Sequence, residues 1–155
     1  PLGRAAPPTL TYDTQAIWLT LDEWALRACP PAEQSAALYS LAGALRLATA
    51  VEELCDPSDI DALSVPSHPE TDLPTIVLYD AVPGGVGITE AAMKRLPRIL
   101  QRALDILEQC PYCATRPESR GCPYCVTAPY GDESTINRMA AIELVKQLLP
   151  VSVAR

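Results

Sequence analysis

The chain has 155 residues, 48% of them hydrophobic, and its 12 Lys and Arg against 19 Asp and Glu give a formal net charge of −7. This length favours one domain with a packed core, and the acidic balance argues against a free-standing nucleic-acid binder, which normally has a basic surface. The chain has no apolar run of the roughly 20 residues that a membrane span requires and no secretory signal, so we expect a cytoplasmic protein without membrane partners.

Three segments are expected along the chain. Residues 1–8 are rich in Pro and Ala and begin with Pro-Leu-Gly, so we expect them to be disordered or the remnant of an expression tag. Residues 9–150 are expected to form a single zinc-binding α+β domain, and residues 151–155 a C-terminal tail. The abrupt start without Met indicates a piece of a longer protein.

The sequence of the first half of the domain predicts a strand, a long helix and a second strand. Residues 9–21 are rich in Thr, Tyr, Ile and Trp, which favours one strand or two short ones, and residues 22–31 form a connector or one helical turn. The strongest helix covers residues 33–55, because its apolar side chains alternate spacings of four and three. That stripe consists of Ala37, Leu41, Ala44, Ala48, Val51 and Cys55. Asp56-Pro57 should end the helix, and residues 59–65 form a short strand.

The second half begins with a β-branched apolar run at residues 75–80, which predicts a buried central strand. A helical stretch then reaches about Gln109, and Pro97 either kinks it or starts a second helix. The loop of residues 110–130 carries most of the cysteines, and Asp132-Glu133 opens a last helix to Leu149. The expected fold is α+β: a small mixed β-sheet packed with three or four helices, plus a four-cysteine zinc loop.

Two CPYC sequences stand in the loop and supply four cysteines, Cys110, Cys113, Cys122 and Cys125. Paired CxxC turns bring four thiolates to one point, as a tetrahedral Zn²⁺ site requires. A reducing compartment with a metal accounts for this spacing better than disulfides do. Cys29 and Cys55 are distant in sequence and are not expected to be ligands. A closed four-cysteine site has no open position for substrate, so a structural role is favoured over a DNA or partner contact, and a redox role is weaker.

A glycine-rich turn follows the expected central strand and consists of Asp80, Pro83, Gly84, Gly85 and Gly87 with their neighbours. Bare N–H groups at a helix start suit a phosphate, but neither a Walker A nor a GxGxxG spacing is present. The favoured interpretation is a tight structural turn in which the Asp80 carboxylate accepts hydrogen bonds from backbone N–H groups.

Charged and polar side chains elsewhere offer weaker candidates. A basic strip at helical spacing is a candidate DNA contact, although on an acidic domain such side chains usually pair with acids; it consists of Lys94, Arg95, Arg98 and Arg102. The only histidine, His68, is expected to be exposed in a loop, and Glu52-Glu53 to lie on a solvated helix face.

Four features follow one another along the chain: the segment Thr14–Leu19, the strand ending in Asp80, the Pro83–Gly87 turn and the Gly121–Cys125 block. In this order they resemble the C-terminal zinc-binding domain of MrfA-like superfamily 2 helicases. The resemblance covers about residues 12–149. It implies a Zn²⁺ ion held by the four CPYC cysteines, and helicase motor domains of the parent chain and single-stranded DNA as partners.

The resemblance further implies a non-catalytic accessory domain of an ATP-dependent DNA helicase that acts in repair or phage defence. The chain has no ATP-binding or motor motif, so no enzyme activity is expected of it. One alternative is a protein-interaction zinc module in a defence or repair complex. Another is a small enzyme that uses Asp80 and the glycine turn on a phosphorylated substrate. The sequence sets no oligomeric state.

Overall fold

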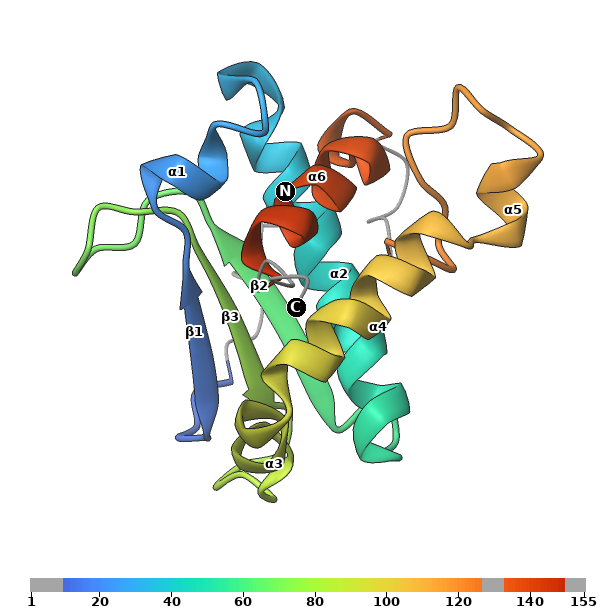
Figure 1. Ribbon diagram of the computed structural model, residues 1–155. Helices are drawn as coiled ribbons and strands as arrows, with labels where there is room; N and C mark the ends of the chain where they lie inside the picture. The colour runs from blue at the N-terminus through green and yellow to red at the C-terminus, as the bar shows by residue number, and fades with distance from the viewer. Residues whose placement is uncertain (1–9, 127–132, 150–155) are drawn as a thin grey trace, which may run out of the picture.

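The computed structural model describes residues 10–126 and 133–149 (Figure 1). Its elements, in chain order, are β1 (Ala16–Thr20), α1 (Glu23–Leu26), the 3₁₀ turn η1 (Pro31–Glu33), α2 (Gln34–Glu53), β2 (Ile60–Val65), β3 (Thr75–Asp80), α3 (Ile88–Lys94), α4 (Leu96–Glu108), α5 (Pro111–Ala114), η2 (Glu133–Thr135) and α6 (Arg138–Leu148). The expected α+β class is therefore confirmed. Within the described residues no helix is both long and apolar enough to cross a membrane.

The three strands form one sheet in the order β1-β3-β2, with β3 in the centre as its apolar run predicts. Both pairings are antiparallel, so the sheet is antiparallel where a mixed one was expected. The register places Val77 of β3 between Trp18 of β1 and Leu63 of β2. Because side chains alternate along a strand, these three residues share one face of the sheet, and Ile17, Leu78 and Ala62 share the other.

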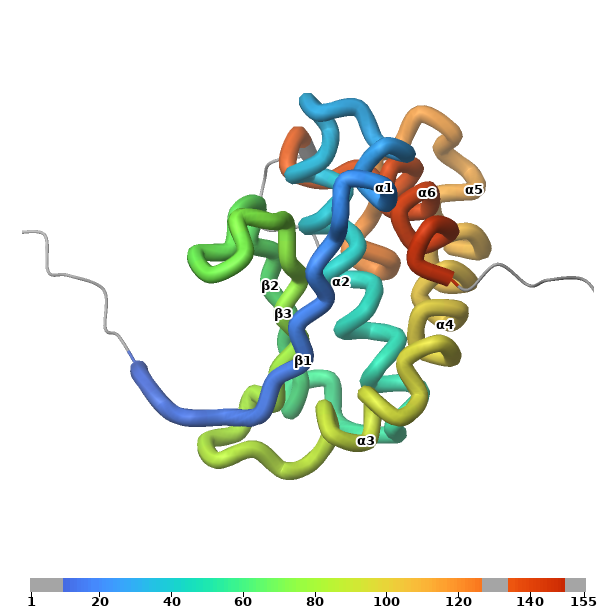
Figure 2. The backbone as a smooth tube through the Cα atoms, turned by 60° about the vertical axis from the view of Figure 1, so that its left-hand side comes forward, coloured from blue at the N-terminus to red at the C-terminus, as the bar shows by residue number. Residues whose placement is uncertain are grey.

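The helices are layered on the second of these faces. Helix α2 packs against β2 and β3, while α4 and α6 contact α2 and each other on its far side (Figures 1 and 2). Ile17, Ile60, Ile76 and Leu78 are all at most 6% exposed, so the sheet and α2 enclose the main core. The first face has no helix over it among the described elements, and Trp18 and Leu63 there stay 50% and 42% exposed.

Helix α2 is the central element because its small residues let neighbours approach on several sides. Ala37, Leu41, Ala44 and Ala48 of the predicted stripe are fully buried. The stripe fails at Val51, which is 52% exposed. The helix ends at Glu53, before the predicted Asp56-Pro57 stop, because Leu54 takes a left-handed conformation with φ of 53°.

The later helices differ from the sequence expectation mainly in where they begin. Pro97 lies in the first turn of α4, where its missing N–H costs nothing, so the long stretch is two helices that meet at Arg95. The last helix begins at Arg138, because the Asn137 side chain accepts a 3.0 Å hydrogen bond from the N–H of Ala140 and caps it. Asp132, the expected start, lies outside the described residues, and the 3₁₀ turn η2 precedes the cap.

Candidate metal centre

The first CPYC sequence forms a turn immediately after α4. Cys110 precedes α5, Pro111 occupies its first turn, and Cys113 lies on its buried side. The N–H of Ala114 donates to the carbonyl of Cys110 at 3.1 Å, which closes this turn. The second CPYC sequence closes similarly, since the N–H of Val126 donates to the carbonyl of Cys122 at 3.0 Å. The repeated sequence therefore produces two similar turns that face each other.

The four sulfur atoms of Cys110, Cys113, Cys122 and Cys125 all lie within 4.8 Å of one another. Three of the separations are 3.5 Å (Cys110 to Cys122), 3.6 Å (Cys113 to Cys125) and 3.7 Å (Cys122 to Cys125). A tetrahedral Zn²⁺ with Zn–S bonds of about 2.3 Å requires sulfur separations of about 3.8 Å. The cluster thus has the size and donor set of a four-thiolate zinc site, and zinc is the cofactor that it supports.

Burial makes charged thiolates unfavourable at this position unless a cation joins them. Burial raises the pKa of Cys113 and of Cys125, which is 0% exposed. Burial also acts to raise the pKa of Cys110, but hydrogen bonds from the Cys113 N–H and from the Cys122 thiol outweigh it and lower the value to about 7. A divalent cation at the centre of the cluster supplies the opposite charge that these four thiolates, three of them on buried cysteines, need.

Gly121 allows the chain to enter the second turn. Its φ is +143°, and a Cβ built there would lie 2.6 Å from Cγ2 of Val126. A larger residue would displace Val126, which is fully buried directly after Cys125. Glycine is therefore required beside the second cysteine pair.

Arg120 fastens the loop to the rest of the domain, a role that the sequence did not indicate. Its guanidinium donates to Glu33 at 2.7 Å and to the carbonyl of Ile136 at 2.9 Å. Its own carbonyl accepts a 2.6 Å hydrogen bond from the N–H of Arg138, at the start of α6. Only the position of Arg120 immediately before Gly121-Cys122 could have suggested this role.

The two tyrosines of the CPYC sequences stack on each other. The ring centroids of Tyr112 and Tyr124 are 4.2 Å apart, and the ring planes differ by 10°. Both side chains remain exposed, by 54% and 65%. The same position in each repeat thus places an aromatic ring at the surface of the loop.

The glycine-rich turn after β3 is organised by the buried carboxylate of Asp80. Oδ2 accepts hydrogen bonds from the N–H groups of Val86 (2.7 Å), Gly87 (2.8 Å) and Ile88 (3.2 Å), and Oδ1 accepts one from Thr89 (2.8 Å). Burial acts to raise the pKa of Asp80, but the backbone hydrogen bonds from Thr89 and Val86 outweigh it and hold the pKa below its usual value.

The glycines of this turn adopt conformations that other residues avoid. The φ angles of Gly84, Gly85 and Gly87 are +84°, +74° and +87°, and Pro83 precedes them. A substrate-binding role needs an unpaired carboxylate, yet Asp80 is 0% exposed and both its oxygens accept hydrogen bonds. The geometry is that of a structural turn, and it argues against the small-enzyme alternative.

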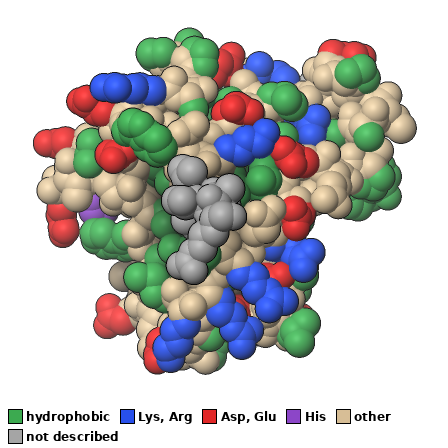
Figure 3. All heavy atoms as spheres, in the orientation of Figure 1, with side chains coloured by type: hydrophobic (Ala, Val, Ile, Leu, Met, Phe, Trp, Pro, Cys, Tyr) green, Lys and Arg blue, Asp and Glu red, His purple; other side chains and the backbone are tan. Residues whose placement is uncertain are grey.

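The basic strip runs from the last residue of α3, through Arg95 at the junction of the two helices, to the first half of α4, at the opposite end of α4 from the cysteine loop (Figures 1 and 3). Each of its members forms an ion pair: Lys94 with Glu90 (3.3 Å), Arg95 with Glu53 (3.8 Å), and Arg98 and Arg102 with Glu52 (2.6 and 2.7 Å). Because the strip and the cysteine loop lie at opposite ends of α4, the structure does not bring the strip together with the four cysteines.

Two expectations about polar side chains are wrong. Glu52 and Glu53 do not lie on a solvated face; their side chains are 5% and 8% exposed, because α4 covers this end of α2 and its arginines reach them. His68 is not an exposed loop residue either. It is 9% exposed, because its ring packs on Trp18 with centroids 4.4 Å apart, and its Nδ1 accepts a hydrogen bond from the N–H of Glu70.

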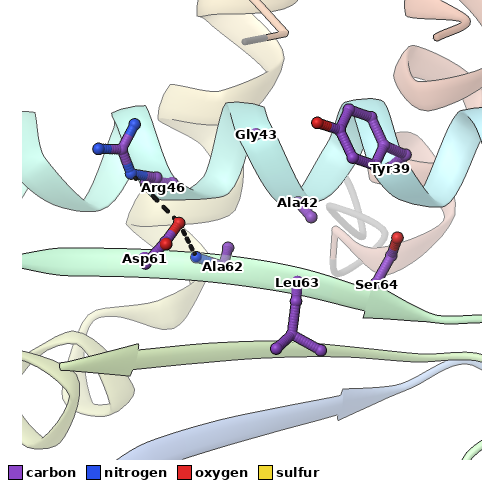
Figure 4. Close-up of a pocket in the computed structure, with 8 residues that line it drawn as sticks. All are labelled: Tyr39, Ala42, Gly43, Arg46, Asp61, Ala62, Leu63 and Ser64. Carbon is purple, nitrogen blue, oxygen red and sulfur yellow. Dashed lines mark hydrogen bonds and ion pairs between the residues drawn. The ribbon is translucent and has the colours of Figure 1, made fainter. Parts of the chain in front are cut away.

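A polar hollow of about 300 Å³ lies between α2 and β2, lined by Tyr39, Arg46, Asp61 and Ser64 among others (Figure 4). Its charges neutralise each other, since Nε of Arg46 lies 3.5 Å from Oδ1 of Asp61. Arg46 also donates to the carbonyl of Ile60, and Asp61 accepts from the N–H of Ala62. These contacts cap the open edge of β2 and leave no free charge here for a ligand.

The fold and the cluster together define a small α+β domain with a four-cysteine zinc site. A profile of the family described as "MrfA Zn-binding domain" matches residues 41–126, more than half of the chain. The chain therefore belongs to the MrfA Zn-binding domain family. This match includes α2 from Leu41 onward, the sheet strands β2 and β3, and all four cysteines.

Relatives and solved structures agree with this assignment. The chain is 35% identical over 74 residues to the "Uncharacterized ATP-dependent helicase YprA" of Bacillus subtilis (strain 168). The aligned region covers 48% of this chain and 10% of YprA. It matches the "DUF1998 helicase MrfA bound to DNA" with a TM-score of 0.62 and 26% identity, over 86% of this chain and 17% of that one. A second structure, of the "DUF1998 helicase MrfA bound to DNA and AMPPNP", matches with a TM-score of 0.62 and 28% identity, over 86% of this chain and 15% of that one. The chain thus corresponds to a small part of each relative.

Proposed function

We propose that this domain is the non-catalytic zinc-binding module of an ATP-dependent DNA helicase. The observation that carries the proposal is the cluster of four sulfur atoms within 4.8 Å, in a fold of the MrfA Zn-binding family. We assign Cys110, Cys113, Cys122 and Cys125 as the zinc ligands. Four thiolates fill a tetrahedral site, so the metal has no open position for water or substrate and acts structurally.

The zinc ion orders the loop between α4 and α6 in this proposal. Over residues 111–124, the described stretch of this loop that holds the two turns, the side chains other than the cysteines are exposed or half-buried, so hydrophobic burial alone holds it weakly. The ion pair of Arg120 with Glu33 then fixes the ordered loop against the start of α2. Asp80 and the glycine turn have a comparable role at the other end of the domain, where they start α3.

The open face of the sheet is the surface that we assign to the motor domains of the parent chain. Trp18, Val77 and Leu63 form an apolar row across the three strands, and Trp18 and Leu63 remain about half exposed. Apolar rows on a sheet are normally covered by another layer. The small share of each helicase relative that this chain matches supports a cover made by the rest of such a chain.

The basic strip is a candidate for contact with the DNA backbone. Its Lys and Arg side chains remain 41–73% exposed despite their ion pairs, so a phosphate can approach them. The paired carboxylates remove much of the net charge, and we therefore expect the isolated domain to bind DNA weakly.

All six cysteines are free of disulfide bonds, which suits a reducing cytoplasm. The pathway that we favour for the parent helicase is DNA repair or phage defence.

Reading the complete gene and assaying the isolated chain test this proposal. We expect a longer reading frame with a Walker A sequence and no ATP hydrolysis by the 155-residue chain, with or without single-stranded DNA. A reading frame without nucleotide-binding motifs would favour the protein-interaction module instead. ATP hydrolysis by the isolated chain, lost on mutation of Asp80, would overturn the non-catalytic role.

A further inference from the structure

The stacked tyrosines form an aromatic surface that the domain does not bury. Their parallel arrangement, at 4.2 Å and 10°, uses one face of each ring, while 54% of Tyr112 and 65% of Tyr124 stay exposed. Exposed, preformed aromatic faces suit flat ligands, because stacking then costs little further ordering.

The rings are held in place by the metal loop itself. Tyr112 lies between Cys110 and Cys113, and Tyr124 lies between Cys122 and Cys125. In each turn the tyrosine directly precedes one cysteine and follows the other by two positions. Because the four sulfurs converge on one point, the backbone of each tyrosine is held on both sides. The carbonyl of Tyr112 also accepts a 3.0 Å hydrogen bond from Thr115 Oγ1. The two stacked rings therefore form a rigid surface, which we call the aromatic platform.

A hollow of about 320 Å³ opens beside the rings, lined by both tyrosines, Thr115, Arg116, Ser119 and Cys122 among others. Arg116 is exposed and forms no ion pair within the part of the chain that the structure describes. Its neighbour Arg120, by contrast, is bound to Glu33. An aromatic platform, hydroxyl groups and an uncompensated cation thus converge on one small hollow.

We propose that Tyr112 and Tyr124 form a stacking platform for a base of single-stranded DNA, with Arg116 contacting a neighbouring phosphate. The inference rests on the proposed function, because a helicase module meets unpaired strands. Every base has a π-face, so the contact is independent of sequence, as a moving strand requires. Arg116 supplies the positive charge that attracts the backbone.

Binding of a fluorescent oligothymidylate to the 155-residue chain at low salt, followed by anisotropy, tests the platform. We expect Tyr112→Ala and Tyr124→Ala each to weaken binding about tenfold, because a stacked base is lost. Tyr112→Phe and Tyr124→Phe keep the rings and should bind like the wild type. Arg116→Ala should weaken binding and make its salt dependence less steep by about one phosphate contact, whereas Arg116→Lys should retain that slope.

The control is Arg27→Ala, which removes another exposed arginine, at the end of α1 away from the loop, and should leave binding unchanged. Equal binding by the Ala variants and the wild type, or no binding by the wild type at low salt, would overturn the platform. Zinc content of the same samples separates the two proposals. A wild-type chain with one zinc and no affinity for DNA overturns the platform alone. Tyrosine-dependent binding without zinc supports the platform and overturns the metal assignment.

Discussion

Glu52 of α2 accepts a 2.7 Å hydrogen bond from Nε of Arg102 on α4, although the carboxylate is 5% exposed. Its second oxygen lies 2.6 Å from Nε of Arg98, one turn earlier on the same helix. The hydrogen bond from Arg102 and the two positive charges hold the pKa of Glu52 below its usual value. The two long helices are therefore joined by ion pairs to a buried carboxylate from two partly exposed arginines, as well as by apolar packing.

Glu52→Gln should lower the melting temperature by several degrees. The amide keeps the shape of the side chain but removes its charge, so Arg98 and Arg102 lose the partner that compensates them. Thermal unfolding by circular dichroism measures the change. Glu90→Gln is the matched control, because its pair with Lys94 is exposed (67% and 73%) and should contribute almost nothing. Equal melting temperatures for both variants would contradict a structural role of the network.

Asp80→Asn should destabilise the domain by about 3 kcal/mol, since hydrogen bonds to a buried charged acceptor are strong and an amide NH₂ would face backbone N–H donors. Chemical unfolding measures the loss. The control is Asp105→Asn, whose carboxylate has one exposed hydrogen bond from Gln101 and should change stability by less than about 0.5 kcal/mol. Full stability of Asp80→Asn would show that the glycine turn holds itself without the carboxylate.

Cys122→Ser should abolish zinc binding and unfold the domain. Zinc-linked folding energies reach about 10 kcal/mol, which is comparable to the whole stability of a small domain. Solubility and a thermal unfolding curve report the outcome. Cys55→Ser changes a thiol outside the cluster and should keep one zinc per chain with a change of about 1 kcal/mol. A cooperative unfolding transition at the wild-type temperature for Cys122→Ser would speak against a structural four-cysteine site.

Short-range sequence patterns correctly predicted the elements that depend mainly on residues close together in the sequence. The periodic stripe of α2, the β-branched run of β3 and the CxxC spacing each determine their structure within a few residues. The errors arose where distant parts of the chain meet. Glu52 and Glu53 look solvated on α2 alone and become covered only when α4 crosses them.

His68 illustrates the same limit from a loop. Its neighbours Ser67 and Pro69 are typical of an exposed turn, yet its ring packs against Trp18, which is 50 positions away in sequence. Arg120 likewise joins Glu33 across the fold, and no short-range pattern indicates that pair. Single-sequence reasoning therefore identified the metal cluster but missed the contacts that anchor it.

The metal content of the native chain tests the central claim most directly. Elemental mass spectrometry, combined with unfolding followed during removal of the metal by a chelator, should find one zinc per chain and loss of fold as zinc leaves. Absence of metal in a folded protein, with the four loop cysteines either freely reactive or joined as disulfides, would contradict the zinc module and leave the two CPYC turns with a redox role to explain.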